Sequence, residues 1–296
     1  MDIRKAVITA AAPDQHTLPL QRLVDRQGQD KTALQLIVEE VTGAGIEELC
    51  LVIRPGDQVS YEQAAGEHLG MIHFVDQTEP RGYGDALLRA RDFVGDDPFL
   101  HLVGDHLYLS DSDTCCAKQL IDIAREHACA VSAVQATREN KLPDFGAVGG
   151  SHVARHTDLY EVTRVIEKPT PTQAEQELII AGLRAGYYLC FFGMHVLTPF
   201  VMETLEHLQS ETVGHESTPA ALSSRGANRS ITLSDALSVL AQRQKYLATE
   251  LKGTRYNIGA QYGLLIAQLA LSLTGRDRDH ILTELVELLA MRNNRA

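Results

Sequence analysis

Four short segments of this chain carry residue types that bind phosphate esters and divalent cations. Backbone N–H groups at a turn, carboxylates and amines are the groups that hold such ligands in proteins. The segments are Ala11-Ala-Pro-Asp-Gln-His16, Gln77 with Gly82-Tyr-Gly84, Gly104-Asp105 and Ile166-Glu-Lys-Pro169.

The first segment follows Ala6-Val-Ile8, an apolar run that predicts a buried strand. In an open α/β sheet the turn after the first strand is a usual place for a ligand. A phosphate-binding turn normally contains glycine, because a Cβ keeps the anion from the backbone, and it adds Arg or Lys as countercharge. This turn offers Ala12, Asp14 and His16 instead. It therefore has the position of a phosphate loop without the usual composition.

Gly82 and Gly84 come before a predicted helix, whose free N–H groups would face a ligand, although a plain tight turn fits as well. Asp105 ends an apolar strand, where a carboxylate suits Mg²⁺; an N-cap or turn aspartate is the alternative. Lys168 follows Glu167 at the end of another apolar segment. It could hold a sugar phosphate or form a solvated ion pair.

The composition limits the class of protein. With 296 residues, 44% of them hydrophobic, the chain can form one large core, or one core with a smaller lobe. A net charge of −12 without clusters of Lys and Arg argues against nucleic acid, so any phosphate site must be local, with a divalent metal to offset repulsion. There is no run of eighteen apolar residues and no signal peptide pattern. We therefore expect no membrane association and a cytoplasmic location.

The cysteines do not indicate a site. They are odd in number and lack a CxxC spacing, so they predict neither disulfides nor zinc but small buried side chains: Cys50, Cys115, Cys116, Cys129 and Cys190. The intervals between His101, Asp105 and His106 and between His152 and His156 resemble those of metal ligands. On strands they would not form a tetrahedral set.

The elements that must position these residues alternate between apolar strands and amphipathic helices up to about Ala136, which is typical of a parallel sheet covered on both faces. We expect strands at Ala6–Ala10, Glu48–Ile53, Met71–Val75, Phe99–Val103 and Ala130–Ala136, and helices at Thr32–Thr42 and Gly82–Val94.

After Asn140 the pattern changes to paired antiparallel strands, which we expect to form an inserted lobe over residues 140–195 that includes a strand at Tyr187–Phe192. Helices are expected at His195–Leu208 and Leu233–Arg243, a further strand at Tyr246–Leu251, and a mobile loop at Ser210–Ser230.

Two helices close the chain over residues 260–296. The last carries a broad apolar face formed by Ile281, Leu282, Leu285, Val286, Leu288 and Leu289. This face suits either docking on the core or a subunit interface.

In order and spacing, these segments resemble the bacterial UTP–glucose-1-phosphate uridylyltransferases, part of the sugar-1-phosphate nucleotidyltransferase family. The resemblance covers nearly the whole chain. It runs through Lys5-Ala-Val-Ile8, Leu18-Pro19, Asp30-Lys31, Gly43-Ala-Gly-Ile46, Leu51-Val52, Gln77, Gly82-Tyr-Gly-Asp-Ala86, Gly104-Asp105, Phe145-Gly146, Glu167-Lys-Pro169, Gly186-Tyr-Tyr188, Leu233-Ser-Asp-Ala236 and Asn257-Ile-Gly259.

The resemblance implies an α/β fold with a Rossmann-like mixed, mainly parallel sheet, helices on both faces and the small antiparallel lobe on the sugar side. It implies one nucleotidyltransferase-like domain over residues 1–296. It also implies formation of a UDP-sugar and pyrophosphate from UTP and a hexose 1-phosphate with Mg²⁺. Such catalysis depends on positioning and charge neutralisation.

The resemblance also implies a role for each matching residue. The nucleotide would contact Ala11, Ala12, Gln77 and Gly82, and the sugar Gly146, Glu167 and Gly186. Asp105 and Asn257 would hold the metal. The phosphates would be neutralised by Lys168, Arg22 and His16.

The chain departs from the family at the phosphate and metal positions. The family's G-x-G-T-R loop reads Ala12-Pro-Asp-Gln-His16, and the P-K-E-M segment after it is absent. The second metal aspartate is Asn257, and the acidic pair before Leu233 reads Arg229-Ser230. Loss of one preorganised charge-stabilising group costs about 100- to 1,000-fold in rate.

Two functions follow from this pattern. One is a uridylyltransferase-like enzyme, weakened at the phosphates. The other is a catalytically inactive relative that senses a nucleotide or sugar nucleotide, or that serves as partner subunit to an active paralogue. The resemblance further implies a homo-oligomer.

Overall fold

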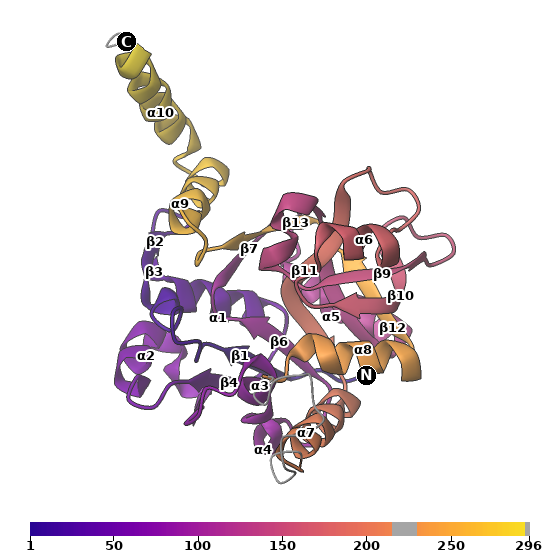
Figure 1. Ribbon diagram of the computed structural model, residues 1–296. Coiled ribbons are helices and arrows are strands. Elements are labelled where there is room, and N and C mark those ends of the chain that lie inside the picture. Colours follow the sequence, from indigo (N-terminus) through magenta and orange to yellow (C-terminus); the bar gives the residue numbers. More distant parts are fainter. Residues whose placement is uncertain (215–229, 294–296) are drawn as a thin grey trace, which may run out of the picture.

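The computed structural model describes residues 1–214 and 230–293. Its centre is a nine-stranded sheet with the strand order β5-β4-β1-β6-β11-β8-β12-β10-β9 (Figure 1). The strands are β1 (Lys5–Thr9), β4 (Glu48–Ile53), β5 (Ile72–Asp76), β6 (Phe99–Val103), β8 (Ala130–Arg138), β9 (Ala147–His152), β10 (Leu159–Ile166), β11 (Tyr187–Leu197) and β12 (Tyr246–Glu250).

The first four strands of this order form the parallel sheet that the apolar runs predict. β1 pairs in parallel with β4 and β6, and β4 pairs in parallel with β5. Successive side chains point to opposite faces, so Ile8 enters one apolar cluster and Val7 the other. The expected strands here are confirmed to within one residue at each end.

The expected inserted antiparallel strands continue the same sheet. β11 runs antiparallel to β6 and β8, and β9 and β10 follow as an antiparallel pair. Because β9 also pairs with β11, the strands from β11 to β9 close on themselves. The expected antiparallel strands are therefore present, and the closure brings residues 146–149 beside β11.

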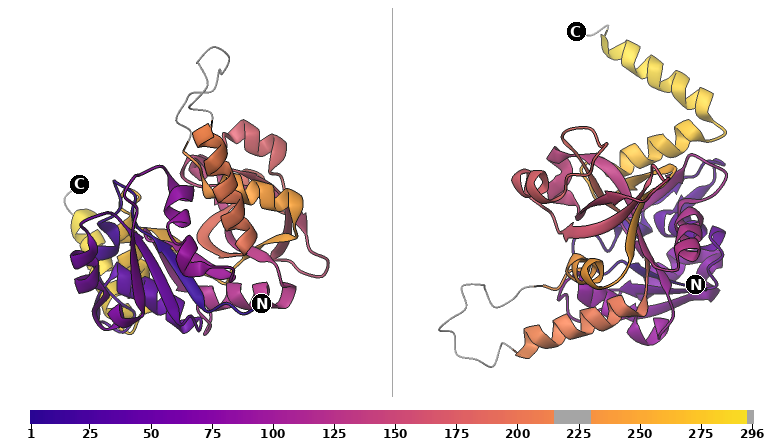
Figure 2. Two further views of the ribbon diagram at one scale, coloured as in Figure 1. Left: turned by 90° about the horizontal axis from the view of Figure 1, so that it is seen from below. Right: turned by 90° about the vertical axis from the view of Figure 1, so that its right-hand side faces the viewer.

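Helices cover both faces of the sheet, as expected (Figures 1 and 2). Each set of helices buries its apolar residues in its own cluster. One face carries α1 (Ala33–Gly43), α2 (Gln58–Ala65) and α5 (Cys116–His127); the other carries α3 (Tyr83–Leu88), α4 (Arg91–Val94), α7 (Pro199–Gly214) and α8 (Leu233–Arg243).

The remaining elements are short. They are η1 (Leu18–Leu20), η2 (Gly66–Met71), η3 (Glu139–Asp144), α6 (Pro171–Glu177), the strand pair β2 (Arg22–Val24) and β3 (Asp30–Thr32), and the strand pair β7 (His106–Ser110) and β13 (Gly253–Asn257).

Three expected helix boundaries are wrong. The segment 82–94 is two helices, α3 and α4, separated by Arg89 and Ala90. Residues 195–197 belong to β11, because they pair with β6 beyond an irregularity between Phe191 and His195, and α7 begins only at Pro199. Proline favours the first turn of a helix because its missing N–H would be unpaired there.

α7 also extends through Gly214, so the first part of the loop expected at Ser210–Ser230 is helical. The rest of that expected loop, residues 215–229, lies outside the described residues, as does Arg229.

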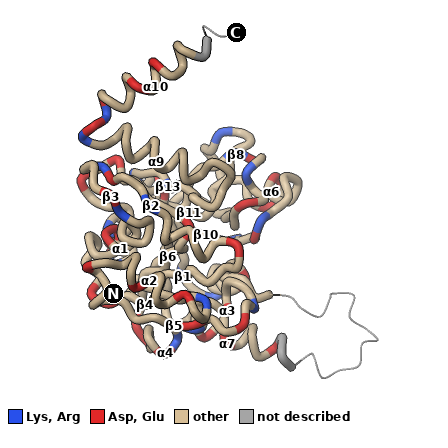
Figure 3. Tube along the Cα trace, turned by 90° about the vertical axis from the view of Figure 1, so that its left-hand side faces the viewer, with Lys and Arg blue, Asp and Glu red and all other residues tan. Residues whose placement is uncertain are grey.

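The C-terminal helices α9 (Gly263–Thr274) and α10 (Arg278–Asn293) form an arm. α9 contacts β2 and β13, whereas α10 packs on α9 and projects from the body (Figures 1 and 3). Leu288 and Leu289 are 59% and 63% exposed, so of the two alternatives, docking on the core or a subunit interface, docking on the core does not occur. No helix within residues 1–214 and 230–293 has the length and apolar character to cross a bilayer.

The cysteines behave as expected for small apolar side chains. All five are free, and four are buried: Cys50, Cys116, Cys129 and Cys190. Cys115 is half-buried, and its thiol donates a hydrogen bond to the carbonyl oxygen of Glu40 at 3.6 Å.

Candidate active site

A cavity of about 490 Å³ opens where β1 and β6 end. Eight of the twelve sequence-predicted site residues line it: Ala11, Ala12, Gln77, Gly82, Asp105, Gly146, Glu167 and Lys168. The structure adds further lining residues that were not predicted, among them Thr9, Tyr83, His106, Asp144, Phe145, Phe191, Gly193, His195 and Ser234.

The first turn approaches Asp105 because Gly104 leaves space for it. The N–H of Gly104 donates to Thr9 O at 2.9 Å, and a Cβ on Gly104 would lie 3.0 Å from the Cβ of Ala10. A side chain there would push the ends of β1 and β6 apart. Glycine at this position therefore sets the metal-type carboxylate beside the turn.

Backbone donors remain in the turn although its glycines are gone. In the described part of the chain, neither Ala11 nor Ala12 donates its N–H to another residue. Asp14 is exposed and does not line the cavity, so its charge points away from a ligand held there. The turn keeps N–H groups for a phosphate and turns its carboxylate outward.

His16 also turns away from the cavity. Its Nδ1 lies 2.7 Å from Asp57 Oδ2, and the hydroxyl of Tyr61 donates to its carbonyl oxygen at 2.5 Å. The position that the family fills with arginine is thus tied to α2 rather than directed at a ligand. Arg22 is equally remote, since it pairs with Asp30 on the β2–β3 hairpin and is 63% exposed.

The turn at Gly82 can be formed only by glycine. Gly82 has φ +116° and ψ −179°, a backbone conformation essentially restricted to glycine, and a Cβ there would lie 2.7 Å from Ser230 Cβ. The Nε2 of Gln77 donates to Gly82 O at 3.1 Å and to Asp85 Oδ2 at 2.7 Å. Because both partners are acceptors, Gln77 Nε2 must face them, and its Oε1 is left as the acceptor beside the cavity.

The opposite end of the cavity is formed by β9, β11 and α8. Ser234 Oγ donates to Glu167 Oε2 at 2.6 Å, and the N–H of Phe191 donates to Gly146 O at 2.9 Å. A Cβ on Gly146 would lie within 2.9 Å of Phe191, Glu167 and Ser234. These four residues form a compact polar and aromatic surface against which a small ligand can lie.

Lys168 has a strained backbone. Its φ of +45° lies in the left-handed region, which is rare outside glycine, and the following Pro169 further disfavours any helical conformation. Such strain costs on the order of 1–3 kcal/mol and persists where the surroundings enforce it, often at functional sites. Here it accompanies a lysine that lines the cavity.

Asp105 is held as a carboxylate. Burial alone would raise its pKa, but the neighbouring His106 outweighs this effect by charge and by a hydrogen bond, so the pKa of Asp105 lies below the usual value. His106 Nδ1 is 2.8 Å from Asp105 Oδ1. An ionised carboxylate at the end of β6 is a suitable ligand for a hard divalent cation.

Asn257 lies close to Asp105 but its side chain is already used. β13 pairs with β7 so that Asn257 lies opposite His106, and the N–H of Ile258 donates to Asp105 O. The Oδ1 of Asn257 accepts from the N–H groups of Gly259 and Ala260, at 2.8 and 3.1 Å. Both lone pairs of this carbonyl are therefore occupied, and Asn257 does not line the cavity.

Gly186, just before β11, lies outside the cavity, and Gly193 within β11 lines it. Gly193 has φ +82°, sits at the irregularity of β11, and a Cβ there would lie 2.8 Å from Val103. A glycine inside an apolar strand often marks a bulge or a close approach of backbone, and this signal could have identified Gly193. Ser234 lay inside a matching segment, whereas nothing local indicated Phe191 or His195.

The charges of the cavity are mainly negative. Among the described residues that line it are three carboxylates, those of Asp105, Asp144 and Glu167, and one amine, that of Lys168. A phosphorylated ligand would be repelled by this surface unless a cation came with it. Within the described residues no group of three or more His, Cys, Asp or Glu could hold a metal by itself.

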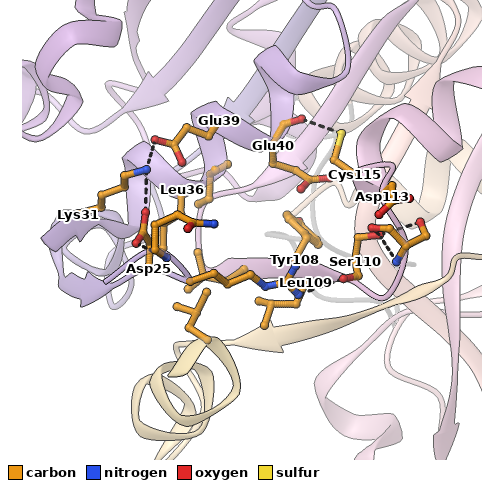
Figure 4. Close-up of a pocket in the computed structure, with 16 residues that line it drawn as sticks. Asp25, Lys31, Leu36, Glu39, Glu40, Tyr108, Leu109, Ser110, Asp113 and Cys115 are labelled. Carbon is orange, nitrogen blue, oxygen red and sulfur yellow. Dashed lines mark hydrogen bonds and ion pairs between the residues drawn. The ribbon is translucent and has the colours of Figure 1, made fainter. Parts of the chain in front are cut away.

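A second cavity, of about 350 Å³, lies between α1 and β7 (Figure 4). Three of its charged side chains are paired with one another: Lys31 Nζ lies 2.9 Å from Asp25 and 2.6 Å from Glu39. Glu40 accepts from the N–H of Ala117 at 2.6 Å at the start of α5. None of the sequence-predicted site residues lines this cavity, so we assign the candidate site to the larger cavity.

Comparison with known proteins identifies the family of this chain. The family model described as nucleotidyl transferase matches residues 21–236. The chain belongs to the nucleotidyl transferase family. A UTP–glucose-1-phosphate uridylyltransferase 2 of Streptococcus pyogenes is 30% identical over 298 residues, which cover 92% of this chain and 91% of the relative. One of Streptococcus pneumoniae is 30% identical over 292 residues, 89% of this chain and 88% of the relative.

The fold of this nucleotidyl transferase is found in solved structures. A UDP-glucose pyrophosphorylase complexed with UDP-glucose superposes with a TM-score of 0.69 at 22% identity, over 91% of this chain and 98% of that chain. The mixed sheet with helices on both faces is thus the fold of the family, as the motif order predicts.

Proposed function

We propose that this protein transfers the uridylyl group of UTP to a hexose 1-phosphate and releases pyrophosphate. The observation that carries the proposal is that one cavity contains the base-side loop with Gln77 and Gly82, the Asp105 carboxylate and Lys168. Relatives at 30% identity that bear the name UTP–glucose-1-phosphate uridylyltransferase support glucose 1-phosphate as the hexose phosphate.

The nucleotide would occupy the end of the cavity near β1 and α3. Gln77 Oε1 can accept an N–H of the uracil, and the constrained Gly82 turn holds the Gln77 amide through its carbonyl oxygen. The unpaired N–H groups of Ala11 and Ala12 can donate to the triphosphate. These contacts use backbone and amide groups, so they need none of the missing glycines or the missing arginine.

The hexose 1-phosphate would occupy the opposite end. Glu167, held by Ser234, can accept hydroxyl groups of the sugar, and Gly146 lets the side chains of Phe191, Glu167 and Ser234 come together at this end. The amine of Lys168 would neutralise the sugar phosphate. This assignment of Gly146, Glu167 and Lys168 retains their sequence-predicted roles and replaces Gly186 by Gly193.

A divalent metal ion, Mg²⁺ by the chemistry of the donors, would be held by Asp105 together with the phosphates of UTP. Mg²⁺ in nucleotide sites typically uses one or two carboxylates plus phosphate oxygens, which fits a cavity with one suitable carboxylate and an occupied Asn257. When bound, the ion would neutralise charge on the phosphates.

In the reaction, an oxygen of the hexose 1-phosphate attacks the α-phosphorus of UTP, and the bond to the bridging oxygen of pyrophosphate breaks. No protein group needs to add or remove a proton. The protein holds the two substrates in line and places Lys168 against the charge of the attacking phosphate. Because His16 and Arg22 lie outside the cavity, we expect turnover to be slower than in a site with the full basic loop.

The test is release of pyrophosphate from UTP and glucose 1-phosphate with Mg²⁺. We expect turnover that falls at least about 100-fold in Asp105→Asn and Lys168→Met and is unchanged in Arg22→Met, the control outside the cavity. No turnover, together with a rise in melting temperature on adding UDP-glucose, would instead identify a binding module. Absence of both would overturn the proposal.

We further propose that the exposed apolar face of α10 is covered by a second copy of the chain. The exposed side chains of Val286, Leu288 and Leu289 make this face of α10 more apolar than a helix face that only water covers. Light scattering should give a dimer or larger oligomer that becomes a monomer in Leu288→Glu with Leu289→Glu. Because UTP is found in the cytoplasm, the proposed reaction also implies a cytoplasmic location.

A further inference from the structure

His195 has no place in the reaction described so far, although it lines the cavity. It belongs to β11, is only 3% exposed, and its Nε2 has no hydrogen-bond partner within the described residues. Some side-chain atoms of the described residues have neither solvent contact nor a hydrogen-bond partner, namely Arg89 Nε, His106 Nε2 and Thr198 Oγ1. His195 Nε2 is not one of them, so it is not fully enclosed. A buried imidazole thus presents one free ring nitrogen to the cavity.

The hydrogen bonds behind His195 determine the state of this nitrogen. Ser132 Oγ lies 2.6 Å from His195 Nδ1 and 2.5 Å from the hydroxyl of Tyr246. Within the described residues, the hydroxyl of Tyr246 has no other partner, so it must donate to Ser132 or leave a buried O–H unpaired. Ser132 then donates its own proton to His195 Nδ1.

The two alternatives each leave one buried hydroxyl proton without an acceptor. If Ser132 donated to Tyr246, the phenolic proton would be orphaned; if His195 donated to Ser132, the serine proton would be orphaned. An unpaired buried donor costs about 1–3 kcal/mol. The arrangement that avoids this cost places the proton of His195 on Nε2, where it faces the cavity.

This imidazole is neutral. Burial lowers the pKa of His195 well below its usual value, and the adjacent His101 lowers it further. The rings of His101 and His195 are stacked at 6.0 Å. His101 itself has no free nitrogen, since Nδ1 faces Val7 O at 3.0 Å and Nε2 faces the hydroxyl of Tyr83 at 2.5 Å.

The position of His195 identifies the part of the ligand it would meet. The ring of Phe191 contacts His195 edge-on at 5.0 Å, and the same ring bounds the space beside Gly146. Gly146 in turn adjoins Glu167 and Ser234. Through Phe191, His195 adjoins the hexose end, where a neutral N–H donor matches an uncharged oxygen rather than a phosphate; its ring also stacks on His101.

We propose that the Nε2–H of His195 donates a hydrogen bond to a hydroxyl oxygen of the bound hexose and so contributes to sugar specificity; this inference rests on the proposed function. Ser132 and Tyr246 are positioning residues, because they touch only the imidazole. Glu167 accepts from the sugar and His195 donates to it, so the two groups together would recognise the orientation of hydroxyls.

The binding test compares UDP-glucose with UDP by calorimetry. We expect His195→Phe to weaken the binding of UDP-glucose about tenfold and to leave the affinity for UDP unchanged. Ser132→Ala is a smaller change that lets the imidazole change tautomer. It should weaken the binding of UDP-glucose less and also leave the affinity for UDP unchanged. Equal losses for both ligands, or no loss in either variant, would overturn the assignment.

A ligand-free measurement tests the tautomer. In protein labelled with ¹⁵N-histidine, the His195 signals, assigned by their absence in His195→Phe, should show the Nε2–H form. The Nδ1–H form would overturn the inference while leaving the proposed function intact. If wild-type protein binds neither UDP nor UDP-glucose, the proposed function fails, and this role of His195 fails with it.

Discussion

The guanidinium of Arg255 lies over the ring of Phe145, 3.9 Å from its centroid. Nη1 of Arg255 also donates to the carbonyl oxygen of Phe191 at 2.5 Å, so this one side chain contacts both aromatic residues of the hexose end. Arg255 is buried, and in the described part of the chain no carboxylate forms an ion pair with it. Burial lowers its pKa to about 10, which leaves it charged at neutral pH.

Arg255→Met should therefore disturb the hexose end without touching the nucleotide. We expect KM for glucose 1-phosphate to rise about tenfold with little change in KM for UTP, because the lost stacking and hydrogen bonds are each worth about 1–2 kcal/mol. Steady-state kinetics with each substrate varied measures this split. Arg255→Lys, which keeps charge but loses the planar stack, should be intermediate; equal rises in both KM values would contradict the positioning role.

Gly146→Ala should block the hexose end directly. The new methyl group would lie 2.8 Å from Phe191 and 2.9 Å from both Glu167 Oε2 and Ser234 Oγ. We expect loss of glucose 1-phosphate binding while UTP still raises the melting temperature. The control is Gly70→Ala, where a methyl group meets nothing within 4 Å. Retained glucose 1-phosphate affinity in Gly146→Ala would remove the sugar from this end of the cavity.

Asn257→Asp should restore metal binding more effectively than His16→Arg restores charge. An aspartate can keep accepting from Gly259 and Ala260 with one oxygen and leave the other free for a cation, whereas an arginine at 16 would be drawn to Asp57. We expect Asn257→Asp to raise kcat about tenfold and to lower the Mg²⁺ concentration required, with little gain from His16→Arg. Pyrophosphate release measured against Mg²⁺ concentration decides between them, and the opposite ranking would refute this reading of both side chains.

Acid should destabilise the protein through His101. Burial lowers the pKa of His101 to about 4, below the value of 6.5 expected in the unfolded chain. Between these values the unfolded state binds more protons, so the free energy of unfolding falls as pH falls from 6.5 to 4, by about 3 kcal/mol for this group. Urea unfolding across this range should show a shallower decline in His101→Gln, and an identical decline would exclude His101 as the cause.

Glu40 should have the opposite effect. Burial raises its pKa to about 7, above the ordinary 4.5, so the unfolded state loses its proton first and stability falls as pH rises from 4.5 to 7. Glu40→Gln should therefore raise the free energy of unfolding by up to about 3 kcal/mol at pH 8.5 and leave it nearly unchanged at pH 4. The neighbouring Glu39→Gln, which loses an ion pair with Lys31, should give no such gain.

The parallel half of the fold could be predicted because its signals are local. Apolar runs such as Glu48–Ile53 and Phe99–Val103 specify strands by themselves, and their order along the chain sets the parallel crossovers. For the same reason Gln77, Gly82, Asp105 and Lys168 could be placed near a common edge, since each follows such a run.

What the side chains do at that edge was decided only by the tertiary structure. Gly193 rather than Gly186 lines the cavity because of the bulge where β11 meets β8. The free proton of His195 depends on Ser132 and Tyr246. In sequence, Ser132 is 63 residues from His195 and 114 residues from Tyr246. His16 and Asn257 have suitable types, yet Asp57 and the turn after β13 occupy them. A sequence determines which groups are present and which strand they follow; hydrogen-bond partners brought together by folding determine which of those groups remain free for a ligand.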